Sequence, residues 1–256
     1  MKDSFIDNIS WQIKPFLALN IIAVLLLGSW LLPETRFLWD KLDLAIFSSL
    51  NSLIATFGKD FSFLLAITCH KKFDLIMLAV IMLLSIIPGF LFPKKDFHRY
   101  IFVLGFLILC LVAIAGQNLG LFHRLSPSLA VETANRLIGI TFETKTISND
   151  SFPGNHGMVI MAWLGFILLY SQRYSSKLIA LSIGMLFLLP RMTVGAHWFT
   201  DNFVGGASFA LIFLAWINFT PIKALPIKLA DFIVSKFQAF SNDLFKKDEL
   251  KEELKS

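Results

Sequence analysis

The sequence predicts an all-α, polytopic membrane protein with six transmembrane helices and additional helices at the membrane interface. Of its 256 residues, 56% are hydrophobic and only 16% are charged, and the mean hydropathy is +0.69. A water-soluble domain does not need so large an apolar fraction. The net charge of +5 is spread between and after the apolar segments, where basic residues set topology and contact lipid headgroups. No nucleic-acid partner is therefore expected.

Six apolar segments are long enough, or nearly so, to cross a bilayer as helices, which takes about 20 residues. They cover residues 16–32, 73–92, 100–116, 156–170, 177–189 and 202–219. Residues 33–72 are more mixed: 42–53 is amphipathic and 61–68 is too short to span, so this stretch predicts helices that lie at the interface.

The chain divides into a six-span membrane domain, residues 1–222, and a tail, residues 223–256. The tail is amphipathic from residue 227 and strongly charged after residue 246. This composition predicts a cytoplasmic helix that lies on the anionic inner leaflet.

The basic residues predict an orientation with both termini in the cytoplasm. That orientation puts fourteen of the 23 lysines and arginines inside, and the short segment 93–99 alone holds three. The short segment 190–201 holds only Arg191, as the positive-inside rule requires of an outer loop. The long connection 117–155 then faces the same outer side, so the two polar segments can build one site.

The segment 190–201 places an arginine, a histidine and an aspartate between two apolar spans, as Arg191, His197 and Asp201. Ionisable groups near hydrocarbon are costly and indicate a functional site. Arginine binds phosphate oxygens in a bidentate fork, histidine is a nucleophile, and a carboxylate orients it. If His197 and Asp201 share the first turn of a helix, their i,i+4 spacing places them on one face. For this block alone, a purely structural His–Asp pair is the alternative.

Two further blocks come from the outer connection. Asp150-Ser-Phe-Pro-Gly-Asn-His156-Gly opens the fourth span, where Pro-Gly turns the chain and a helix N-terminus offers N–H groups to an anion. His156 is placed to act as a general acid, although an interfacial helix cap explains the block equally well. Gln117 to Pro127 leaves the third span and supplies Arg124, which is a weak signal by itself.

Together, the three blocks in a six-span chain resemble the type 2 phosphatidic acid phosphatase superfamily. Its signature is Lys-x6-Arg-Pro, Pro-Ser-Gly-His and Ser-Arg-x5-His-x3-Asp. The shared residues are Arg124, then Pro153 and His156, then Arg191, His197 and Asp201. The departures are Gln117 for lysine, Leu125 for proline, Gly154 and Asn155 for Ser-Gly, and Pro190 for serine.

The resemblance implies a six-helix core and a phosphohistidine intermediate formed without a metal or other cofactor. It implies that His197 is the nucleophile, Asp201 its orienting carboxylate and His156 the general acid. It also implies phosphate binding by a larger set, namely Arg124, Arg191, Gln117, Gly154 and Asn155.

The departures point to a subfamily. The sequence of the blocks between about residues 116 and 206 is similar to that of the bacterial lipid A 1-diphosphate synthases. These inner-membrane enzymes move a phosphate from undecaprenyl diphosphate to the 1-phosphate of lipid A at the periplasmic face. The resemblance therefore implies these two lipids as partners and a multi-pass inner-membrane location.

Two alternatives stay open. One is a periplasmic-facing phosphatase that hydrolyses undecaprenyl diphosphate or a lipid A phosphate. The other is a transporter or scaffold, which predicts ionisable groups on facing helices at mid-membrane. Here those groups cluster at the ends of spans on one side, which favours an enzyme.

Overall fold

The computed structural model describes residues 6–115, 122–137 and 143–253, and within these ranges it is helical with no β-strand, which confirms the predicted fold class. The elements are α1 (Ile13–Leu31), α2 (Pro33–Thr68), α3 (Phe73–Ser85), α4 (Phe97–Ala115), α5 (Pro127–Ala130), α6 (Asn155–Tyr170), α7 (Tyr174–Thr193), the π-helix η1 (Asp201–Gly206), α8 (Ala207–Phe219), the 3-10 turn η2 (Pro221–Lys223) and α9 (Ala224–Glu253).

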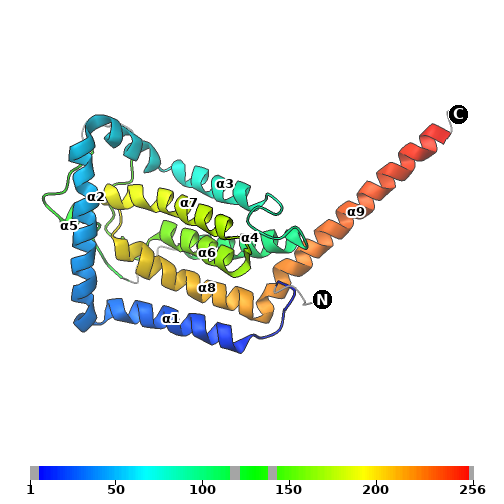
Figure 1. The fold of residues 1–256 in the computed structure, drawn as a ribbon, viewed down its shortest axis with the longest axis horizontal. Coiled ribbons are helices and arrows are strands. Elements are labelled where there is room, and N and C mark those ends of the chain that lie inside the picture. The colour runs from blue at the N-terminus through cyan, green and yellow to red at the C-terminus, as the bar shows by residue number, and fades with distance from the viewer. Residues whose placement is uncertain (1–5, 116–121, 138–142, 254–256) are drawn as a thin grey trace.

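Helices α1, α6, α7 and α8 run roughly side by side, and α2 crosses one end of this bundle (Figure 1). By length and composition α2 is among five helices of the described chain that could cross a membrane. Its direction across the bundle end instead agrees with the predicted interfacial position. The helix bends at Gly58, whose φ of 70° is outside the helical range.

Two predicted spans have different ends in the structure. The second was expected to run to residue 92, but α3 ends at Ser85, because Pro88 and Gly89 follow and Gly89 adopts a φ of 79°. The fifth was expected to end at residue 189, but α7 continues through Pro190 to Thr193. Arg191 therefore lies on the last turn of a helix and not in a loop.

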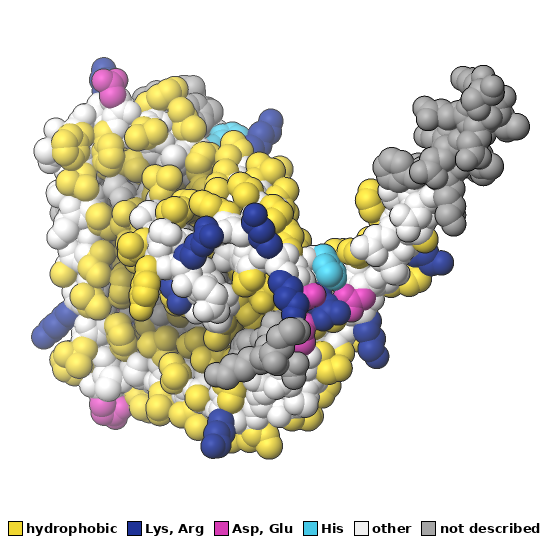
Figure 2. Space-filling model, turned by 45° about the vertical axis from the view of Figure 1, so that its right-hand side comes forward, with side chains coloured by type: hydrophobic (Ala, Val, Ile, Leu, Met, Phe, Trp, Pro, Cys, Tyr) yellow, Lys and Arg dark blue, Asp and Glu magenta, His cyan; other side chains and the backbone are white. Residues whose placement is uncertain are grey.

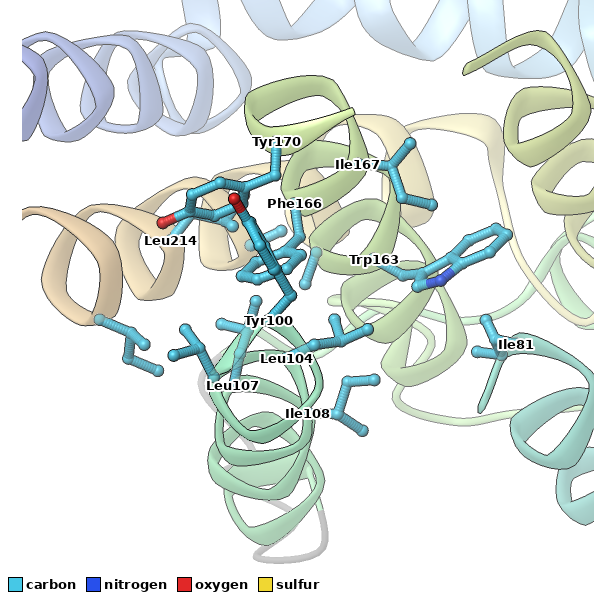
Figure 3. Packing of buried hydrophobic residues seen from close by; sticks show 14 of the residues in the cluster. Ile81, Tyr100, Leu104, Leu107, Ile108, Trp163, Phe166, Ile167, Tyr170 and Leu214 are labelled. Carbon is cyan, nitrogen blue, oxygen red and sulfur yellow. The ribbon is translucent and has the colours of Figure 1, made fainter. Parts of the chain in front are cut away.

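The main apolar core lies between α4 and α6 (Figure 3). Aromatic rings from α6 meet the buried face of α4, and Tyr100 packs edge-on to Tyr170. Polar atoms inside this core are paired: Trp163 Nε1 donates to Ser85 Oγ at 3.0 Å, and the Tyr170 hydroxyl donates to Asn218 Oδ1 at 2.9 Å. The core fixes α6, whose N-terminal end carries His156.

Helix α6 packs backbone to backbone against η1 and the start of α8. A Cβ atom on Gly206 would lie 2.7 Å from the carbonyl carbon of Gly157, which is closer than real Cβ contacts. Small residues allow such an approach between membrane helices. The α6 and η1 elements, which carry His156 and Asp201, are thus held at a fixed separation.

Helix α9 begins at the end of the bundle opposite α2 and projects away from the bundle (Figure 1). Charged side chains gather where it departs, and hydrophobic side chains cover much of the neighbouring bundle surface (Figure 2). Arg99 bonds Asp231 through Nε and Nη2, both at 2.9 Å, and Asp7 through Nη1 at 2.6 Å. The division at residue 223 and the position of the tail on a leaflet stay predictions.

Candidate active site

The end of α7 explains the spacing between Arg191 and His197. Gly195 has a φ of 78°, and its N–H donates to the Met192 carbonyl at 3.2 Å, while Ala196 N–H donates to the Arg191 carbonyl at 2.9 Å. This is the Schellman pattern that ends helices at a left-handed glycine. His197 N–H also donates to the Arg191 carbonyl, at 3.3 Å. One reverse turn therefore carries both side chains.

Asp201 caps the next helical segment. Its Oδ2 accepts the backbone N–H of Trp198 at 2.7 Å, three residues earlier, as an acidic side chain does in the first turn of a helix. The segment then widens into the π-helix η1, a distortion common at functional sites. Asp201 has no exposed surface.

The His197 imidazole is oriented through Nδ1. Nδ1 lies 3.0 Å from the Ser151 carbonyl oxygen and 3.5 Å from Asp201 Oδ2. Because a carbonyl only accepts, Nδ1 carries the proton, and in the neutral imidazole Nε2 therefore keeps its lone pair. Nε2 is buried and has no hydrogen-bond partner within the described ranges. This is the form of a histidine nucleophile.

His156 is held by a carboxylate on another helix. Its Nε2 lies 2.8 Å from Asp74 Oδ1, and the same oxygen accepts a hydrogen bond from Arg191 Nη2. His156 Nδ1 and Arg191 Nη1 are buried, and in the part of the chain that the structure covers neither has a hydrogen-bond partner. The His156 and His197 rings are 6.2 Å apart, centroid to centroid.

Arg124 lies in a second ion-pair cluster beside this one. Its Nη1 donates to Asp201 Oδ1 at 2.7 Å, and its Nη2 donates to Asp43 Oδ2 at 2.6 Å. Asp43 also accepts from the backbone N–H and hydroxyl of Thr200, at 2.9 and 2.6 Å. The guanidinium is therefore engaged by two buried carboxylates, and it binds Asp201 Oδ1 while the Trp198 N–H binds Oδ2.

Comparison with the sequences of known proteins assigns the chain to a family. The model of the PAP2 superfamily matches residues 102–222, a range that contains Arg124, His156, Arg191, His197 and Asp201. The lipid A 1-diphosphate synthase of Escherichia coli (strain K12) is 35% identical over 213 residues, which are 80% of this chain and 87% of that protein. The chain belongs to the PAP2 superfamily. No solved structure matches it.

Membership in the PAP2 superfamily, together with the relative's name, makes this chain an enzyme that acts on phosphate groups. Its apolar helices make it a membrane protein. The same evidence confirms the resemblance found in the sequence, including the similarity to lipid A 1-diphosphate synthases. The roles of individual residues stay predictions.

The structure brings together most of the side chains that the PAP2 resemblance implicates. His156, Arg191, His197 and Asp201 are all buried around one point. The Gly154 N–H is used internally, because it donates to the Asp201 carbonyl at 2.9 Å. Asn155 begins α6, beside His156. Gln117 lies outside the described residues.

Sequence reasoning missed three contributors to this PAP2 site, namely Asp43, Asp74 and the Ser151 carbonyl. Asp74 lies in the first turn of the apolar helix α3, so the rule that intramembrane charges mark function would have identified it. Asp43 lies on the amphipathic α2, close to Asp40 and Lys41, and the rule does not single it out. The carbonyl of Ser151 carries no sequence signal, because any residue has one. Among the described residues, no group of three or more His, Cys, Asp or Glu side chains could hold a metal, and metal independence stays a prediction.

Proposed function

We propose that this enzyme transfers the terminal phosphate of undecaprenyl diphosphate to the 1-phosphate of lipid A at the periplasmic face of the bacterial inner membrane. The name of its Escherichia coli relative supports the product. The observation that carries the mechanism is the buried, unpartnered Nε2 of His197, whose Nδ1 proton is fixed by the Ser151 carbonyl.

In the first step, His197 Nε2 attacks the terminal phosphorus of the donor. The N–P bond forms, and the bond from phosphorus to the bridging oxygen breaks, which releases undecaprenyl phosphate. His156, protonated on both nitrogens, gives its Nδ1 proton to the departing oxygen. Asp74 accepts the Nε2 hydrogen bond and stabilises this imidazolium.

In the second step, an oxygen of the acceptor 1-phosphate attacks the phosphohistidine. The N–P bond breaks and a new P–O–P linkage forms, while neutral His156 takes any proton that the acceptor oxygen carries. Asp201, 3.5 Å from Nδ1, stabilises the positive charge on the His197 ring while phosphorus is bound. No metal is needed, because nucleophile and acid are both imidazoles.

Phosphoryl transfer depends mainly on position and on stabilisation of the oxygens. Arg191 offers Nη1 to an equatorial oxygen. Asn155 and His156 lie in the first turn of α6, and backbone N–H groups at a helix N-terminus bind anions. Arg124 contributes its charge, and it also keeps Asp201 in position.

The test uses purified protein in detergent with undecaprenyl diphosphate labelled on its terminal phosphate, with and without lipid A. We expect label on lipid A and on the protein, with both lost in His197→Ala. His123→Ala is the matched control, because His123 is an exposed histidine on the connection between α4 and α6. Label found only as inorganic phosphate, whatever acceptor is present, would identify a phosphatase instead.

A further inference from the structure

Lys145 is fixed in place by its backbone although it lies in a connection without regular structure. Its N–H donates to the Cys69 carbonyl at 3.0 Å, and the carbonyl of the next residue, Thr146, accepts the Ser128 hydroxyl at 2.6 Å. The preceding residue, Thr144, forms a β-bridge with His70. The lysine side chain is therefore delivered to a defined place.

That place is a cavity of about 350 Å³ next to His156. Its polar lining consists of Asp74, Lys145, Asn155 and His156, and its apolar lining includes Met77 and Val159. A cavity with charged groups and apolar walls fits a ligand that joins an anion to a hydrocarbon chain.

The charges around this cavity favour an anion. Asp74 is the carboxylate that lines it, and this group already accepts hydrogen bonds from Arg191 and His156. Lys145 Nζ makes no hydrogen bond or ion pair with any residue that the structure describes. Burial and then the nearby Arg191 lower the pKa of Lys145, while Asp74 opposes this only in part. An anion beside Nζ would stabilise the charged form.

We propose that Lys145 binds the inner phosphate of the donor diphosphate, the one that stays on the polyprenyl chain. This rests on the proposed function. Lys145 shares its cavity with His156, the proposed acid for the leaving group, and His197 does not line this cavity. The terminal phosphorus must lie at His197, so the departing phosphate lies on the side of His156 and Lys145.

Equilibrium binding in the His197→Ala background tests this without turnover, with labelled undecaprenyl diphosphate or labelled lipid A in detergent. We expect Lys145→Ala to weaken diphosphate binding about 10- to 100-fold, the usual range for a charge-assisted hydrogen bond. Lys145→Arg should stay within a few-fold of Lys145, and lipid A binding should not change. Lys71→Ala is the matched control, because Lys71 is exposed and pairs with Glu143 at 2.9 Å.

With the nucleophile intact, Lys145→Ala should raise the KM for the donor while kcat changes only a few-fold. Unchanged donor affinity, or a loss confined to lipid A, would overturn the assignment of Lys145 while the proposed function stands. Unchanged lipid A binding in the variant also shows that the protein is folded. If undecaprenyl diphosphate binds to no form and transfers no label, the proposed function fails, and this inference fails with it.

Discussion

At the scale of residues, the spacing of Arg191, His197 and Asp201 was enough to predict a phosphate site, because the types of side chain limit the chemistry. It could not show what completes the site. The sequence pattern gave His197 one partner, Asp201, whereas in the structure the closer contact of Nδ1 is the Ser151 carbonyl. Asp74 was missed because its neighbours in the site lie more than 80 residues away in the chain.

Asp74→Asn tests the proposed role of Asp74 in orienting and charging His156. An amide cannot stabilise the imidazolium as a carboxylate does, so we expect kcat to fall roughly 10- to 100-fold, which is less than the roughly 100- to 10,000-fold of general acid–base catalysis because His156 itself is retained. The alkaline limb of the kcat profile should also move to lower pH, because protonated His156 loses its partner. Asp60→Asn, at an exposed acid of α2, is the control, and equal loss there would remove this role.

Arg191→Lys tests the guanidinium fork. Arg191 uses Nη2 for Asp74 and has Nη1 buried without a partner in the described chain, and a lysine ammonium cannot reach both positions with fixed geometry. We expect kcat/KM to fall by about 100-fold or more, measured as labelled phosphate transferred. Full activity in this variant would mean that Arg191 does not bind the phosphate through its fork and only pairs with Asp74.

At the scale of elements, hydrophobic runs located the spans but not all their ends. The second run, 73–92, continues past Ser85 in composition, yet Pro88 and Gly89 turn the chain. The fifth runs longer than expected because Pro190 is tolerated near a helix end. The close packing of α6 on η1 was not predictable, since glycines at positions 157 and 206 also fit loops or caps.

Gly195→Ala tests the reverse turn at the end of α7. The φ of 78° is unfavourable for alanine, and its Cβ would lie 2.9 Å from the Ser128 nitrogen. The left-handed conformation alone costs about 1–2 kcal/mol, so thermal unfolding in detergent should begin at a lower temperature and activity should fall. Gly105→Ala in α4 is the control, because its Cβ meets no atom within 4 Å and alanine favours a helix. An unaffected Gly195→Ala protein would contradict this.

At the scale of the whole molecule, the all-α class followed from composition, and the gathering of the three blocks followed from topology. Residue counts could not determine how α2 is placed, since its length and hydropathy also suit a span. Its position across the bundle end depends on tertiary contacts, such as Asn51 Nδ2 donating to the Thr193 carbonyl at 2.9 Å.

Labelling from outside the cell tests the predicted orientation. The background lacks Cys69 and Cys110, the two free cysteines of the described chain. Single cysteines are then placed at two exposed positions: Ile147→Cys at the end of the bundle that carries the site, and Gln172→Cys at the opposite end. With the site facing the periplasm, a membrane-impermeant maleimide that has crossed a permeabilised outer membrane should modify position 147 only. Modification of position 172 alone would show that the orientation is the reverse of the predicted one.

Low pH should weaken the attachment of α9. Burial alone would raise the pKa of Asp231, but hydrogen bonds from Arg99 and His98 bring it below the ordinary 3.8. A lowered carboxyl pKa contributes stability above the ordinary value, and this is lost as pH falls through the folded value. The hydrogen-exchange protection factors near Ile227 and Ala230, which are corrected for the intrinsic rate at each pH, should therefore fall below about pH 4. Asp231→Asn should exchange faster already at neutral pH, and a variant with unchanged protection would contradict this.

The turn shared by Arg191 and His197 has a consequence for how the enzyme responds to the bilayer around it. Because one backbone carbonyl holds both residues together, tilting or shifting α7 moves the phosphate-binding group and the attacking nitrogen as a unit. Asp74, on the other hand, belongs to α3, whose lipid-facing surface includes the exposed Leu75 and Leu83. Changes in bilayer thickness that shift α3 against α7 should consequently alter the rate of phosphoryl transfer, through the contact of Asp74 with His156, while donor binding at the unit of Arg191 and His197 stays nearly constant.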